Sequence, residues 1–155
     1  MKRISHLSTG LAAGLISAAL LVGTFAFADE REDYRTKSKQ NDDTIGVIVG
    51  VINYLCPKIA PADAAFCNDA NPVAKALALA QYIDDGKPVQ NKLAGDLFFD
   101  AVEQFKAHIP LREKAKEYAK NGDFKNAFGY EEFAFQYLVK VATQGLLAKN
   151  RVDGA

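Results

Sequence analysis

The chain has 155 residues, and its 19 Lys and Arg balance its 19 Asp and Glu. Two of the basic residues lie in the first 28 positions, which hold no acidic residue, so residues 29–155 carry 17 basic against 19 acidic side chains, a net charge near −2. Nucleic acid is therefore not an expected partner, because phosphate binding needs a basic excess on one face. Residues 29–155 suffice for one domain with one hydrophobic core.

Residues 1–28 have the layout of a secretory signal peptide. A basic start is followed by an uncharged apolar stretch that ends in Ala26-Phe27-Ala28, with small residues at the two positions that a signal peptidase reads. We expect cleavage after Ala28 and a soluble periplasmic or secreted protein, with no membrane span after cleavage. The alternative is an uncleaved anchor, because residues 7–28 are 22 uncharged positions and could span a bilayer.

Residues 29–43 contain ten charged side chains and no Leu, Ile, Val or Phe. Such a segment cannot bury enough apolar surface to offset the entropy lost on ordering. We predict a flexible, charged N-terminal arm, followed by a helical domain over residues 44–150 and a short C-terminal tail over residues 151–155.

Residues 44–56 are dense in β-branched side chains, which by propensity favour a strand. A strand needs a ladder partner, and the rest of the chain offers none, so we assign a buried helix that starts after Asp42 and Asp43. The strand remains the alternative. Gly46 and Gly50 are four residues apart and would let another helix approach closely.

Cys56 and Cys67 bracket a turn that contains two prolines. In an exported protein two cysteines so placed predict one structural disulfide. A redox-active pair is disfavoured because the Cys-x-x-Cys spacing is absent. A Cys/His metal site would need more histidine than the single His108 of residues 29–155.

The next segments show helical spacing and helix boundary residues. Asn71 and Pro72 predict the start of a helix over residues 72–84. A third helix over 93–108 is expected to end at Pro110, and a fourth is expected over 111–120. We therefore predict an all-α, single-domain bundle of about five helices with one disulfide.

The fifth helix, capped by Asp123, is expected to be the central helix of the bundle. Over residues 130–147 its polar positions recur at steps of four, four and three at Glu132, Gln136, Lys140 and Thr143. Nearly all other positions are apolar, so neighbouring helices should cover most of its circumference. Leu138 and Val141, on the side opposite this polar stripe, should be fully enclosed.

The junction of the fourth and fifth helices resembles one tetratricopeptide unit, a helix-turn-helix of 34 residues. The matching residues are Leu111, Ala115, Tyr118, Gly122, Asp123, Phe124, Ala127, Tyr130 and Ala134. The segment departs from that pattern where Glu131 takes an apolar position and where no closing Pro follows, and no second copy is found. Because such arrays need about three units to close a core, we interpret the segment as an ordinary helical hairpin.

Residues 29–155 are poor in catalytic side chains, with Ser38 as the one serine and His108 as the one histidine. No nucleophile, base and orienting group can be assembled from them, so we expect neither enzymatic activity nor a cofactor. Asp96, Asp100 and Glu103 form an acidic row on one predicted helix face. One helix face supplies too few oxygens for a hard cation, so no metal is expected.

Two functions of different class remain. The aromatic surplus and the lack of reactive groups favour a non-catalytic module of the cell envelope that binds a protein or peptide, of unknown identity. The alternative is a carrier that holds a small apolar ligand between helices. The candidate surface for either is formed by Phe98, Phe99, Phe105, Phe128 and Phe135. An internal cavity of a few hundred Å³ would favour the carrier, and a filled core would favour the binding module.

Overall fold

The computed structural model describes residues 29–154, so the predicted signal peptide and its cleavage site lie outside the described residues. The secondary structure of the described residues is all helical, with elements α2 (Glu30–Ile59), the 3-10 helix η1 (Ala65–Asn68), α3 (Pro72–Asp84), α4 (Lys92–Lys120) and α5 (Phe124–Asp153). The all-α class and the disulfide are confirmed. The described residues form four α-helices rather than about five.

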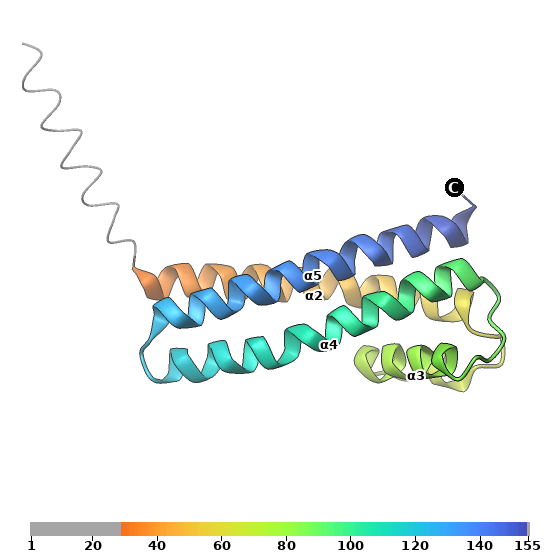
Figure 1. Ribbon diagram of the computed structural model, residues 1–155, viewed down its shortest axis with the longest axis horizontal. Helices are drawn as coiled ribbons and strands as arrows, with labels where there is room; N and C mark the ends of the chain where they lie inside the picture. The colour runs from red at the N-terminus through yellow and green to blue at the C-terminus, as the bar shows by residue number, and fades with distance from the viewer. Residues whose placement is uncertain (1–28, 155) are drawn as a thin grey trace, which may run out of the picture.

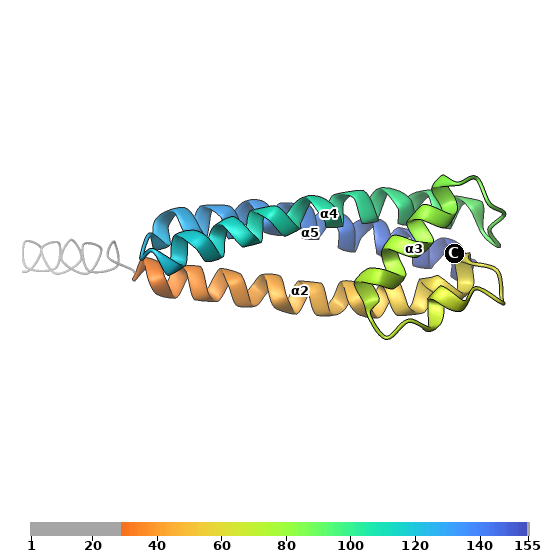
Figure 2. The same ribbon diagram turned by 90° about the horizontal axis from the view of Figure 1, so that it is seen from below.

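Three long helices lie side by side, and the short α3 covers one end (Figure 1). α2 and α5 run in the same direction, and α4 is antiparallel to both. α5 packs along the length of both α2 and α4, whereas α2 and α4 contact each other little. Figure 2 shows α3 crossing from α2 to α4 at the end where the disulfide loop lies. α5 is therefore the central helix, as predicted.

Buried positions in the long helices recur at alternate steps of four and three residues. In α5 they are Ala127, Glu131, Ala134, Leu138, Val141, Gly145 and Ala148. The same spacing is present in α4 from Ala94 to His108 and in α2 from Ile48 to Ile59. This heptad period keeps one narrow stripe of each helix against its neighbours. Leu138 is 0% and Val141 4% exposed, as predicted.

The first half of α2 departs from the prediction of a flexible arm. Asp29 caps the helix by accepting a hydrogen bond from the backbone N–H of Arg31 at 3.1 Å, and the helix continues without a break past Asp43. This segment has few apolar residues to bury, but polar contacts with α5 hold it in place: Asn41, for example, is fully buried against α5. Residues 44–56 are helical, which settles the choice between helix and strand.

Gly46 and Gly50 do not serve the close helix packing that their spacing suggested. Both are exposed, and a Cβ atom built on either would meet nothing within 4 Å. The close approach occurs instead at Gly145 of α5, where a Cβ would lie 2.9 Å from Cγ1 of Val51.

α4 continues through Pro110, where two separate helices were predicted. A proline inside a helix removes one backbone hydrogen bond and crowds the preceding turn. Here the ring lies on the exposed side. The buried spacing passes across it, with His108 before and Ala115 after, so packing on α5 holds both halves in one helix.

The predicted boundaries of α3 and α5 are confirmed at their starts. The Asn71 side chain accepts hydrogen bonds from the first turn of α3, and Asp123 does the same for α5. Gly122 adopts a φ of 81° in the turn before Asp123, a conformation that favours glycine. α5 continues to Asp153, so most of the predicted C-terminal tail is helical.

The disulfide joins α2 to the loop before α3. Cys56 is fully buried and bonds to Cys67 in η1, with the two Cα atoms 5.6 Å apart. The loop is tied further by Gln90, whose backbone N–H donates to the carbonyl oxygen of Ile59 at 2.9 Å.

The large apolar side chains are unevenly distributed along the bundle. Those that are buried lie at the end that carries α3: Ile48, Ile52, Leu55, Ile59, Leu79, Phe98, Val102, Phe105, Leu138 and Val141. Towards the α4–α5 turn, the described helices bury only Ala115, Ala127 and Ala134 as apolar residues. The hydrophobic core is therefore confined to about half the length of the molecule.

Candidate functional site

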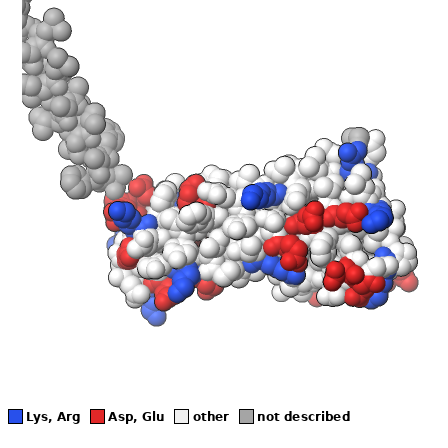
Figure 3. Space-filling model, viewed as in Figure 1, with Lys and Arg blue, Asp and Glu red and all other residues white. Residues whose placement is uncertain are grey.

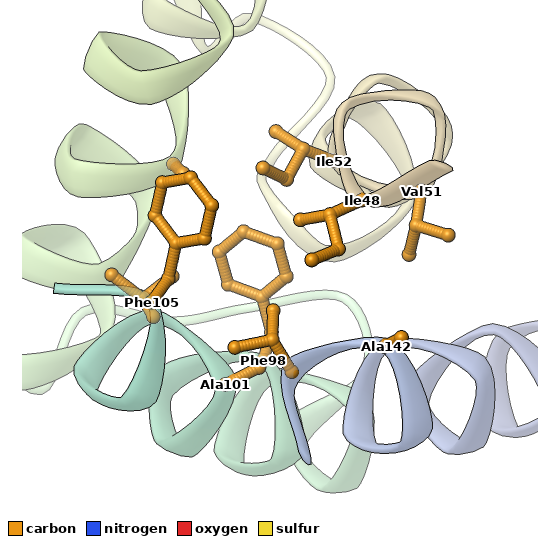
Figure 4. A pocket seen from close by; sticks show the side chains of 11 residues that line it. Ile48, Val51, Ile52, Phe98, Ala101, Phe105 and Ala142 are labelled. Atoms are coloured by element: carbon orange, nitrogen blue, oxygen red, sulfur yellow. The ribbon is translucent and has the colours of Figure 1, made fainter. Parts of the chain in front are cut away.

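The core contains one small hollow where α2, α4 and α5 meet. Phe98 and Phe105 of α4 point towards Ile48 and Ile52 of α2 (Figure 4). Its free volume is about 20 Å³, close to the room that one water molecule needs. Sites for small organic ligands usually enclose several hundred Å³. The hollow between the rings of α4 is therefore much smaller than such a site.

The structure brings together only part of the predicted aromatic surface. Phe98 and Phe105 are 2% and 4% exposed and meet at the hollow. Phe99 lines a different depression. Phe135 lies under the ammonium group of Lys37, 4.5 Å from the ring centre, and neither it nor Phe128 lines the hollow.

Phe99 lies in an open depression between α3 and α4 that contains three carboxylates. Asp84 of α3 and Asp96 and Asp100 of α4 line it together with Ile83. Asp96 forms an exposed ion pair with Lys92, at 3.1 Å. Among residues 29–154, no group of three or more His, Cys, Asp and Glu side chains is arranged to hold a metal ion.

The side of α5 that faces away from α2 and α4 is uncovered. We call it the outward face, and it consists of Phe133, Gln136, Val139, Lys140, Thr143, Leu146 and Leu147, all exposed. Its apolar members are 44–58% exposed. Figure 3 shows that charged side chains are sparse along α5 and gather over α3 and α4. This face departs from the prediction that neighbours cover most of the helix.

A shallow groove runs beside the outward face, between α5 and α4. It is lined by Gln104 of α4 and by Val139, Lys140, Thr143 and Gln144 of α5. The Oε1 atom of Gln144 is buried there and has no hydrogen-bond partner among the described residues. The groove is therefore mostly polar, with Val139 as its apolar lining residue. Val139, Thr143 and Leu146 follow one another at steps of four and three, the spacing that another helix can match.

A polar layer crosses the bundle where the apolar core ends. It consists of Asn41 of α2, Arg112 of α4 and Glu131 of α5. Asn41 Nδ2 donates to the backbone oxygen of Glu131 at 2.9 Å, and Arg112 Nε donates to Glu131 Oε2 at 3.1 Å. Arg112 also reaches Asp42 at 2.8 Å and the hydroxyl of Ser38 at 3.2 Å. Glu131 is 0% exposed, so this is a buried ion pair.

Burial and the charges of the polar layer shift the pKa values of Arg112 and of the nearby His108. Burial alone would lower the pKa of Arg112, but the hydrogen bond to Asp42 and the charge of Glu131 outweigh burial and raise it. Burial lowers the pKa of His108 below its ordinary 6.5, and the charge of Arg112 acts in the same direction. The His108 ring is 4% exposed and its Nδ1 donates to the backbone oxygen of Phe105. His108 is thus a residue of the core.

No protein-family model, curated protein or solved structure matches this chain. The tetratricopeptide-like segment lies in the hairpin formed by α4 and α5. Within residues 29–154, no helix combines the length and the hydropathy needed to cross a bilayer.

The sequence interpretation missed the outward face and the polar layer. The sequence predicts about five helices and cover over most of α5, whereas the four α-helices of the described residues leave this side of α5 open. The polar layer did leave a signal: Glu131 interrupts an apolar stripe at a position of four-three spacing. A charged residue at such a position predicts a buried partner on a neighbouring helix.

Proposed function

We propose that this chain is an exported, non-catalytic protein of the cell envelope that binds a protein or peptide partner on the outward face of α5. The observation that carries the proposal is the exposure of Phe133, Val139, Leu146 and Leu147 along one uncovered side of the central helix. Large apolar side chains that gather on one face are typical of interaction sites. Singly scattered ones would need no such explanation.

The spacing of this face favours a helical partner. An amphipathic helix could place apolar side chains between Val139, Thr143 and Leu146, as helix-in-groove recognition requires. The exposed Lys140 and Thr143 would supply polar contacts at the rim of the groove. Polar groups around an apolar centre are the usual composition of a specific interface.

The alternative, a carrier of a small apolar ligand, receives no support from the core. The hollow beside Phe98 and Phe105 has a free volume of about 20 Å³, and a bound ligand would have to push the rings out of the core. We therefore retain the binding module as the proposed function.

The experiment is site-specific photo-crosslinking in the exporting cell. A photoreactive phenylalanine analogue at Leu146 should give a discrete product heavier than the chain, and Val139→Glu should reduce it strongly. The same analogue at Lys116, on an exposed part of α4, is the matched control and should give no such product. A product of twice the chain mass would identify the partner as a second copy. Equal products from both positions, or none from Leu146, would contradict the proposal.

A further inference from the structure

The two halves of α2 are held to the bundle by different interactions. From residue 48 onward the helix buries Ile48, Ile52, Leu55 and Ile59. Before residue 48 the only fully buried side chain is that of Asn41. We call residues 30–47 the strap. Since apolar burial is the dominant favourable term in helix packing, the strap has far less to lose on leaving the bundle than residues 48–59.

Apart from Tyr34 on the ring of Phe124 and the partly buried Ile45 at the edge of the core, the strap is held by polar and cationic contacts. Lys37 pairs with Glu132 at 2.7 Å and lies over the ring of Phe135. Arg31 lies over the ring of Phe124, 5.3 Å from its centre, and Tyr34 packs against the same ring. Pairs of this kind near the surface contribute little each and are weakened by salt.

The polar layer lowers the cost of opening as well. With the strap in place Glu131 is fully buried, and its Oε1 atom and Asn41 Oδ1 have no hydrogen-bond partner among the described residues. Burying an ionised carboxylate and leaving acceptors unpaired both oppose closure. When the strap lifts, water can solvate Glu131, Arg112 and Asn41 and donate hydrogen bonds to the unpaired acceptors.

We propose that the strap lifts from the α4–α5 hairpin as a unit while residues 48–59 stay packed, so that the native protein has an open form. Opening uncovers the rings of Phe124 and Phe135 and the ion pair of Arg112 with Glu131. The boundary lies between Asn41 of the polar layer and Ile48, where the apolar core begins. The device is independent of the partner proposed for the outward face, because that face is already exposed.

Native-state hydrogen exchange of the full mature chain tests the proposal. Backbone amides of residues 34–47 should have protection factors at least about tenfold lower than those of residues 50–59, although both lie in one helix. Raising the salt concentration from about 0.1 M to 1 M should lower the protection of residues 34–47 only, because screening acts on the contacts of the strap. Equal protection in both halves, with equal response to salt, would overturn the proposal.

An apolar layer provides the control variant. Asn41→Leu combined with Arg112→Met and Glu131→Leu keeps similar side-chain volumes and removes the buried charges. In this variant the strap should become as protected as residues 50–59. Persistence of the full difference in a folded variant would show that the polar layer does not govern opening. The measurement on the unaltered protein decides whether opening occurs, whatever the variant does.

Discussion

Glu131 is the residue whose surroundings depart most from the rest of the core. Its carboxylate is fully buried and accepts hydrogen bonds from Asn41 and Arg112, whose side chain is only 12% exposed. Glu131→Ala leaves the guanidinium of Arg112 without its buried partner, so the free energy of unfolding should fall by about 3–5 kcal/mol. Urea unfolding measures this change.

The control for that variant is Glu113→Ala. Glu113 pairs with Lys116 at 2.9 Å on the surface of the same bundle, and both side chains are more than half exposed. An exposed pair contributes at most about 1 kcal/mol, and often much less. Similar losses at Glu131 and Glu113 would show that Glu131 is solvated and that the polar layer is not a buried one.

Two glycines of α5 should respond to alanine in opposite ways. A Cβ at Gly145 would lie 2.9 Å from Cγ1 of Val51, and the β-branched valine has little rotamer freedom to move away, so Gly145→Ala should cost about 1–3 kcal/mol. Gly129 has nothing within 4 Å, so Gly129→Ala should stabilise the helix by about 0.5–1 kcal/mol. Thermal unfolding of both variants checks this, and a stabilising Gly145→Ala would contradict the close approach of α2 and α5.

Among the elements, the loop between α2 and α3 depends most on a single bond, the disulfide, for its position. Cys56 and Cys67 are 11 residues apart, and η1 buries no side chain completely. Replacing both cysteines by serine should lower the free energy of unfolding by roughly 2–4 kcal/mol, because the unfolded chain regains the entropy of an open loop. Urea unfolding of the variant and of the reduced native protein should agree. No loss in either would mean that the loop is held without the bond.

The elements predicted well from sequence are those whose ends are set by local chemistry. Asn71 with Pro72 and Asp123 after Gly122 mark helix starts, because capping involves only the first turn. The first half of α2 and the passage of α4 through Pro110 could not be predicted in this way. Both depend on packing against α5, which outweighs local composition and the cost of a proline.

The candidate site was harder to predict from the sequence than the fold was. Which side of α5 is covered depends on how many helices surround it, and the count changed when Pro110 proved to lie within one helix. Whether Val139 and Leu146 are covered could therefore not be predicted from their spacing. Asn41 looked like part of an arm because its partners, Arg112 and Glu131, are far away in sequence.

For the whole molecule, we expect the free energy of unfolding to fall in mild acid. The unfolded chain protonates His108 near 6.5, whereas burial lowers the pKa of this residue in the folded protein. The unfolded state thus binds more protons below about pH 6.5, and the free energy of unfolding should decrease there as the pH falls. Hydrogen bonds to Asp123 and Asp153 lower their pKa values from 3.8, so their contributions are lost only in stronger acid.

The variant His108→Gln separates this effect from other acid effects. Its free energy of unfolding should fall less steeply between about pH 7 and pH 5 than that of the unaltered protein, as measured by urea unfolding at several pH values. Parallel curves for the two proteins would mean that His108 takes up its proton in the folded state as readily as in the unfolded chain.

α5 presents one side to the core and leaves large apolar side chains, among them Leu146, exposed on the other. The most direct measurement compares the same substitution on the two sides by urea unfolding. Leu138 is 0% exposed, so Leu138→Ala should lower the free energy of unfolding by roughly 2–5 kcal/mol, through lost transfer energy and the cavity left behind. Leu146→Ala, at a residue 50% exposed, should change stability by no more than about 0.5 kcal/mol. Large and equal losses at both leucines would contradict the account, because Leu146 would then belong to the core and would not be available to a partner.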